Sequence, residues 1–131
     1  MPSPLEILEQ YWGYDQFRPL QAEIIDEVLN GRDVLALLPT GGGKSICFQV
    51  PGMVMEGLTL VISPLIALMR DQVEQLTRRG IPATYINSTL APHEIDRKLQ
   101  KAMDGDYKFL YLAPERLTSE IFRERVRRMK V

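Results

Sequence analysis

Residues 38–45 read Leu-Pro-Thr-Gly-Gly-Gly-Lys-Ser, and this stretch limits the possible folds more than any other part of the chain. Its three consecutive glycines carry no Cβ atoms, so the backbone can adopt positive φ angles and close around a ligand. Backbone N–H groups in such a turn converge on anions. An apolar run, Val34–Leu38, comes before the loop, and apolar residues follow it. This strand–loop–helix order is typical of a phosphate-binding loop.

The residue types within the loop predict a nucleoside triphosphate with Mg²⁺ as ligand. Lys44 supplies a positive charge for the β- and γ-phosphates, and the Ser45 hydroxyl can reach the metal ion. The strict motif requires a glycine at position 38, where this chain has Leu38, so the full pattern is not met. The alternative is a glycine-rich turn with an incidental lysine. We predict that the loop binds nucleotide through Thr40, Gly41, Gly42, Gly43, Lys44 and Ser45, the last two serving catalysis.

Composition indicates an ordinary globular chain. Its 131 residues suffice for one domain, and its 45% hydrophobic content allows a sizeable core. The net charge of −1 gives no overall electrostatic reason to bind nucleic acid or membrane. The lone cysteine, Cys47, excludes an internal disulfide and is expected to be a buried, inert thiol. Without a signal peptide or an apolar run of roughly 20 residues, the sequence predicts a soluble, cytoplasmic protein, or a nuclear one in a eukaryote.

Strand-like and helix-like segments alternate along the chain. This alternation predicts an α/β fold of the P-loop NTPase type, a three-layer αβα sandwich with a mostly parallel sheet. The run 58–62 has no polar alternation, as expected for a strand buried on both faces. Pro51 and Gly52 are expected to interrupt the helix after the loop. The expected strands are 34–38, 58–62, 83–86 and 108–112, and the other expected helices are 4–11, 19–29, 65–79, 92–103 and 117–129.

Three polar segments follow predicted strands. They are residues 39–45, 63–65 and 113–116. Ligands of open α/β sheets bind outside the carboxyl ends of the strands. We therefore expect all three segments to face one rim of the sheet and to form one extended site.

Four sequence blocks, in order, resemble the first motifs of RecQ-type DNA helicases. They are Phe17-Arg-Pro-Leu-Gln21, the loop through Gln49, Val61-Ile-Ser-Pro-Leu-Ile-Ala-Leu-Met-Arg-Asp-Gln-Val73, and Tyr111-Leu-Ala-Pro-Glu-Arg-Leu117. The resemblance covers nearly the whole chain. It implies part of the first motor lobe of a superfamily 2 enzyme. Such an enzyme couples ATP hydrolysis to 3′-to-5′ translocation along single-stranded DNA and to the unwinding of duplex DNA, with roles in repair and recombination.

The resemblance assigns an adenine site to residues before the loop. Tyr14 and Arg18 would sandwich the base, and Gln21 would read its edge through a carboxamide donor and acceptor. Core packing is the alternative for every aromatic residue of this region. It is the favoured interpretation for Tyr11, Trp12 and Phe17.

The same resemblance assigns contacts with the DNA backbone. Ser63 and Pro64 begin a helix whose hydroxyl and N–H groups suit phosphate, and Arg70 and Arg116 would add charge. Arg70 has an equal alternative as a solvated surface residue, and Arg116 an alternative as an ion-pair partner of Glu115. His93 lacks a second ligand at metal-binding spacing and is expected to be an exposed polar residue. The basic residues 123–130 are interpreted as the solvent face of a packed helix.

The family's Asp-Glu-Ala-His block is not in this sequence, and we expect it beyond Val131. A P-loop ATPase needs that acidic partner for Mg²⁺ and for the attacking water, so the isolated chain is expected to turn over little ATP. An unpaired strand edge beside the loop strand would favour self-association. There are two alternative functions. One is an RNA helicase of the same superfamily, and the other is a nucleotide-binding or interaction module without catalysis.

Overall fold

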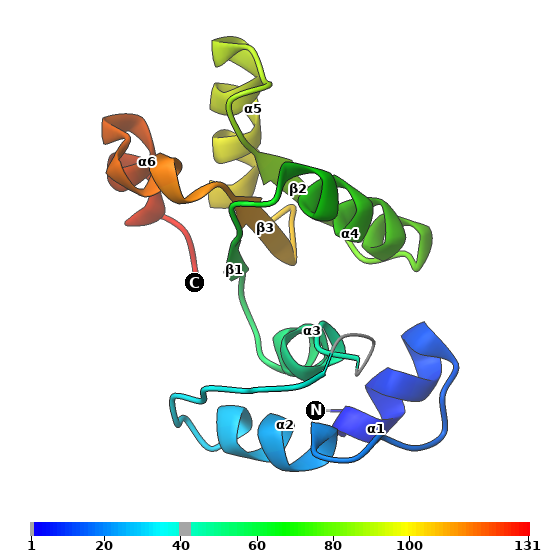
Figure 1. Cartoon of the computed structure of the whole chain (residues 1–131). Helices are drawn as coiled ribbons and strands as arrows, with labels where there is room; N and C mark the ends of the chain where they lie inside the picture. Colours follow the sequence, from blue (N-terminus) through cyan, green and yellow to red (C-terminus); the bar gives the residue numbers. More distant parts are fainter. Residues whose placement is uncertain (1, 40–42) are drawn as a thin grey trace. The chain divides into compact units, whose positions relative to one another are not determined.

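The computed structural model of the chain describes residues 2–39 and 43–131. They form two compact units, Met1–Glu56 and Gly57–Val131, which we call unit 1 and unit 2 and describe separately. Figure 1 shows helices alone in the first unit, and a small sheet with helices around it in the second.

Unit 1 is a cluster of short helices. α1 (Pro4–Ile7) continues into the π-helical turn η1 (Leu8–Trp12), and α2 (Gln21–Leu29) packs against α3 (Ile46–Val54). Ser3 caps the N-terminus of α1, because its Oγ accepts a hydrogen bond of 3.2 Å from the Glu6 N–H. The buried core of the unit comprises Ile7, Leu8, Ile25, Val50 and Val54.

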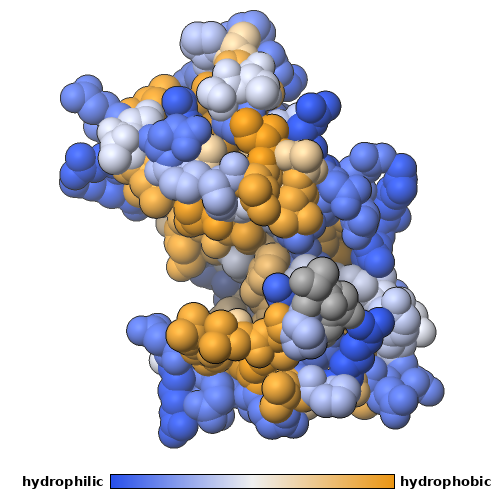
Figure 2. All heavy atoms as spheres, viewed as in Figure 1, coloured by the Kyte–Doolittle hydropathy of each residue, from blue (hydrophilic) through white to orange (hydrophobic). Residues whose placement is uncertain are grey.

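Two expectations for unit 1 are wrong. Val34–Leu38 forms no strand, and Leu35 and Leu37 are 87% and 82% exposed. The other described elements of this unit are helices, so no strand satisfies the peptide groups of the run. Figure 2 shows apolar surface on this unit, in keeping with those exposed leucines. Pro51 does not interrupt α3 either, because the Met55 N–H donates to the Pro51 carbonyl at 2.9 Å and continues the helix.

Unit 2 is built on a parallel three-stranded sheet in the order β1-β3-β2. The strands are β1 (Thr59–Ile62), β2 (Ala83–Ile86) and β3 (Phe109–Leu112). Every residue of the central β3 is buried. β1 is an edge strand with Ile62 43% exposed, so the expectation that the run 58–62 is buried on both faces is wrong.

Helices cover both faces of this sheet, which confirms the layered α/β arrangement within unit 2 (Figure 1). α5 (Pro92–Met103) and α6 (Glu120–Val126) pack on the face that carries Leu110 and Leu112. α4 (Ile66–Arg78) covers the opposite face, where the Tyr111 hydroxyl donates to Gln72 Oε1 at 2.8 Å.

The expected helix 117–129 is divided in the structure. A 3₁₀ turn, η2 (Pro114–Thr118), precedes α6. Ser119 separates them with an extended backbone, φ −68° and ψ 130°. The apolar residues of this segment also differ in burial, because Phe122 and Met129 are buried whereas Leu117 and Ile121 are 41% and 39% exposed.

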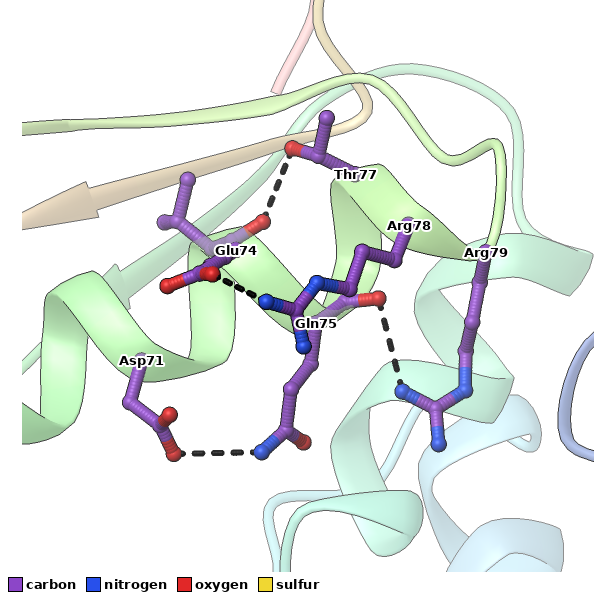
Figure 3. A network of polar contacts seen from close by, with 7 residues as sticks. Asp71, Glu74, Gln75, Thr77, Arg78 and Arg79 are labelled. Carbon is purple, nitrogen blue, oxygen red and sulfur yellow. Dashed lines mark hydrogen bonds and ion pairs between the residues drawn. The ribbon is translucent and has the colours of Figure 1, made fainter.

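The outer side of α4 is held by contacts between successive turns (Figure 3). Gln75 Nε2 donates to Asp71 Oδ2 at 3.1 Å, and Arg78 forms an ion pair with Glu74. The Thr77 hydroxyl donates to the Val73 carbonyl at 2.8 Å. Exposed pairs of this spacing contribute about 0.2–0.5 kcal/mol each, so they support the helix without fixing its position on the sheet.

Candidate nucleotide-binding loop and nucleic-acid rim

The described end of the glycine-rich loop leads directly into α3. Gly43 has a φ of +75°, and Ser45 is the N-cap of the helix. The Ser45 side chain makes no capping hydrogen bond, so its hydroxyl is not committed to the helix end. Lys44 is exposed. The predicted ligands Thr40, Gly41 and Gly42 lie outside the described residues.

Gln21 joins this loop to the segment before α2. Its side chain is 2% exposed, so both ends of the carboxamide need partners. Oε1 accepts a hydrogen bond of 2.8 Å from the Arg18 N–H, and Nε2 donates to the Gly43 carbonyl at 3.1 Å. The donor and acceptor that the resemblance assigns to an adenine edge thus also hold two backbone segments together.

The close approach of Gln21 explains why position 43 requires glycine. A Cβ on Gly43 would lie 2.3 Å from Gln21 Nε2 and 3.8 Å from Arg18 Cδ. The structure therefore brings Arg18, Gln21, Gly43, Lys44 and Ser45 into one neighbourhood of unit 1.

The aromatic residues before the loop differ in exposure. Tyr11, Trp12 and Phe17 are partly buried and pack against the core of unit 1, which confirms their interpretation as packing residues. Tyr14 is 52% exposed, so its ring keeps a free face. Its role in holding a base stays a prediction.

Cys47 is the second residue of α3 and is 6% exposed. Burial raises the pKa of its thiol, with a smaller opposing effect from a backbone hydrogen bond. Its Sγ lies 3.9 Å from the Gly43 carbonyl oxygen. A buried thiol with a raised pKa fits the prediction of an inert group.

In unit 2, two of the predicted polar segments meet at one rim. Ser63 follows β1 and Ala113 follows β3, at the carboxyl ends of paired parallel strands. The Ser63 N–H donates to the Leu112 carbonyl at 3.0 Å, which places the two segments side by side. The Ser63 Oγ accepts from the Leu65 N–H at 3.2 Å just before α4. The third segment, 39–45, belongs to unit 1 and does not follow a strand there, so this prediction is confirmed for two segments only.

The remaining predicted contacts lie on or after the same elements. Pro64 is exposed at the rim, and Arg70 is exposed on α4. Arg116 lies in η2 and is partly buried, with an Nε atom that has no hydrogen-bond partner among the residues described. Residues 2–39 and 43–131 show no ion pair between Glu115 and Arg116, the alternative for Arg116.

A third polar segment at this rim, beginning at Asn87, was not predicted. Asn87 follows β2 and is fully buried. Its Oδ1 accepts from the Thr89 N–H at 2.9 Å, and its Nδ2 contacts Met69 Sδ at 3.7 Å. The signal was present, because Asn-Ser-Thr directly follows the predicted strand 83–86, as the other polar segments follow theirs.

Other kinds of site find no support in the structure. Within residues 2–39 and 43–131, no three His, Cys, Asp or Glu side chains group in a way that would hold a metal ion. His93 is exposed at the start of α5, as expected. None of the helices in the described ranges has the length and apolar character needed to cross a bilayer.

Comparison with known proteins agrees with these motifs. Residues 18–131 match the DEAD/DEAH box helicase family. An ATP-dependent DNA helicase RecQ from Synechocystis is 53% identical over 115 residues, which are 88% of this chain and 24% of that protein. The RecQ of Haemophilus influenzae is 42% identical over 130 residues, 99% of this chain and 21% of that protein. A putative ATP-dependent RNA helicase of Acanthamoeba polyphaga mimivirus is 44% identical over 110 residues, 84% of this chain and 20% of that protein.

The chain thus spans between a fifth and a quarter of the length of these relatives. The family match covers most of the chain and includes the segments that follow β1, β2 and β3. The relatives named RecQ match nearly all of it. The chain therefore belongs to the DEAD/DEAH box helicase family, and the predicted RecQ-type relationship is confirmed.

Proposed function

We propose that this chain is the nucleotide-binding part of a RecQ-like motor that uses ATP hydrolysis to move 3′-to-5′ along DNA and to separate its strands. The observation that carries the proposal is the anchoring of Gly43 by the buried Gln21 at the start of α3. This contact holds the helix end of the loop in the positive-φ conformation.

The residues around this helix end suit a triphosphate with Mg²⁺. The N-terminus of a helix favours anions, because its first N–H groups have no partner within the helix. Lys44 would lie against the phosphates, and the Ser45 hydroxyl, which is not used as a cap, would hold Mg²⁺. The bound ion would neutralise charge on the phosphate oxygens. Tyr14 and Arg18 would enclose the adenine, with Gln21 at its edge.

The rim of unit 2 suits the backbone of a single DNA strand. Ser63 and Pro64 precede α4, and Arg116 follows β3 beside them. Hydroxyls, helix N-termini and arginines are the groups with which proteins hold phosphates without reading sequence. Arg70 on α4 would add a further positive charge to the same strand.

Nucleotide binding is tested on this chain with a fluorescent ATP analogue and Mg²⁺. We expect measurable binding that Lys44→Met abolishes, whereas Lys101→Met, which removes a similar exposed charge from α5, leaves it unchanged. Equal binding by the parent and Lys44→Met would contradict the proposed phosphate site. We expect little steady-state ATPase activity from the chain alone, with or without single-stranded DNA.

Coupling to DNA is tested in a chimera of the Haemophilus influenzae relative in which this chain replaces the matching segment. Ser63→Ala and Arg116→Gln should raise the DNA concentration needed for half-maximal ATPase stimulation and leave the KM for ATP unchanged. A change in the KM for ATP alone would contradict a role at the DNA. Gln21→Ala should weaken ATP binding more than GTP binding, and equal losses would contradict a role in reading the base.

An RNA helicase is the second candidate, because a relative that is 44% identical carries that description. Stimulation of the chimera's ATPase by single-stranded RNA, to the level reached with DNA, would favour this alternative. A chimera that binds ATP and shows no stimulated turnover would favour a nucleotide-binding module.

A further inference from the structure

The sheet of unit 2 has two outer edges, one on β1 and one on β2. The hydrogen bonds between β2 and β3 show which peptide groups of β2 face its outer edge. The Pro82 carbonyl accepts from the Lys108 N–H at 2.7 Å, and the Ile86 carbonyl accepts from the Ala113 N–H at 3.2 Å. Peptide groups along a strand point alternately to its two sides. The N–H and C=O groups of Ala83 and Tyr85 therefore face away from β3, toward the outer edge.

Lys98 covers this edge. It lies on α5 and is half-buried, and its Nζ donates a 2.9 Å hydrogen bond to the outward carbonyl of Tyr85. The same nitrogen lies 4.3 Å from the centroid of the Tyr85 ring, within the range of a cation–π contact.

The path of the Lys98 side chain follows from the two faces of the sheet. Tyr85 pairs with Tyr111, so both side chains lie on the face covered by α4. α5 packs on the opposite face, with Ile86 and Leu112. A lysine that starts on α5 and ends beside the Tyr85 ring must pass around the outer edge of β2.

We propose that Lys98 closes the outer edge of β2 against an added strand, which would come from the exposed apolar run Val34–Leu38 of a second copy of this chain. A pairing strand would need the Tyr85 carbonyl as an acceptor, and that carbonyl is occupied. Pairing would also cover the ammonium group and strip it of water, which costs free energy. Charged side chains, lysine above all, protect sheet edges in this way.

The run Val34–Leu38 is the segment of this chain that could supply the added strand. It is apolar, forms no helix or strand, and leaves Leu35 87% and Leu37 82% exposed. Such segments add to free sheet edges. Burial lowers the pKa of Lys98, which agrees with a stem held between α5 and the edge strand, although Glu94 opposes the shift.

The outer edge of β1 provides an internal comparison. The Thr59 and Ser63 N–H groups point to β3, donating to the Lys108 and Leu112 carbonyls at 2.9 and 3.0 Å. The peptide groups of Leu60 and Ile62 therefore face outward. In the part of the chain that the structure describes, no side chain donates to their carbonyls.

The test replaces Lys98 by methionine, which keeps the apolar stem and removes the ammonium group. Sedimentation velocity over a concentration series should show Lys98→Met self-associating at least about tenfold more tightly than the parent, the factor that one recovered hydrogen bond of roughly 1.4 kcal/mol would give. Lys101→Met, on the exposed side of the same helix, makes the same charge change and should behave like the parent. Lys98→Arg retains a donor and should also behave like the parent.

Residue-level hydrogen exchange identifies the edge that pairs. In associated Lys98→Met, the Ala83 and Tyr85 amides should become protected, and polar substitution of Leu35 and Leu37 should reverse the association. Protection confined to Leu60 and Ile62 would overturn the proposal. So would a Lys98→Met chain that stays as dispersed as the parent while its β3 amides remain protected. If Lys98→Met does not fold, Lys98→Leu, which also lacks a donor, is read in the same two ways.

Discussion

Replacing Gly43 by alanine tests the contact on which the candidate nucleotide site depends. The substitution has two separate costs. A φ of +75° is strained for any residue with a Cβ, by about 1–2 kcal/mol. The new Cβ would also lie 2.3 Å from Gln21 Nε2, so the carboxamide must move and lose its bonds to Gly43 and Arg18. Each of those hydrogen bonds contributes about 1 kcal/mol, which gives a total of roughly 3–4 kcal/mol with the backbone strain.

Gly31 supplies a matched control within the same unit. Its φ is +80°, and a Cβ there would meet nothing within 4 Å. Gly31→Ala therefore carries the backbone strain alone, about 1–2 kcal/mol. The difference between the two variants measures the displacement of Gln21.

Urea unfolding followed by the fluorescence of Trp12 gives the required free energies. Trp12 is the chain's single tryptophan and packs against the core of unit 1, so its signal reports on the unit that contains both glycines. In a Gln21→Ala background, Gly43→Ala should cost no more than Gly31→Ala, because the side chain that it displaces is gone. Equal losses for the two glycine variants in the parent, or no coupling between positions 21 and 43, would refute the reasoning.

Two further predictions concern other parts of the chain. Gly57→Ala should destabilise unit 2 more than Gly105→Ala, because its Cβ would lie 2.5 Å from the backbone oxygen of Lys130, whereas position 105 is open within 4 Å. Exchange of the Leu58 amide, which donates to that oxygen at 2.7 Å, should accelerate in the first variant only. Burial raises the pKa of Cys47, so iodoacetamide should modify it much more slowly in the folded chain than in urea, and equal rates would contradict its burial. Because folding favours the protonated thiol, its contribution to stability is complete below the ordinary thiol pKa and is lost as the pH rises through the raised value, as pH-dependent urea unfolding would show.

Elements with strong local signals could be predicted from the sequence. The strand 83–86 and the helix 92–103 have the predicted bounds, because β-branched and aromatic residues mark the strand and a proline marks the first turn of the helix. The end of α4 is equally local, since Gly80 follows it with a φ of +82°. The segments after β1 and β3 were placed correctly because parallel strands end at a common rim.

Features that depend on distant partners could not be predicted in this way. The apolar run Val34–Leu38 has the composition of a strand, yet a strand exists only where a neighbour pairs with its peptide groups. Composition also did not show which of two apolar runs would be central, and β3 rather than β1 takes that place. The contact between Gln21 and Gly43 joins residues 22 positions apart, so no local pattern reveals it.

The two sides of the glycine-rich loop are consequently held to different degrees. After the loop, Gly43 is fixed by Gln21 and by the start of α3. Before the loop, Val34–Leu38 lies in no strand and exposes Leu35 and Leu37 to solvent. A ligand that contacts both sides of the loop must supply the free energy of fixing residues 34–38. This cost is about 1–2 kcal/mol for each residue that the ligand fixes. Nucleotide affinity in this chain should therefore rise when residues 34–38 are given a strand to pair with, as titration of a fluorescent ATP analogue would measure.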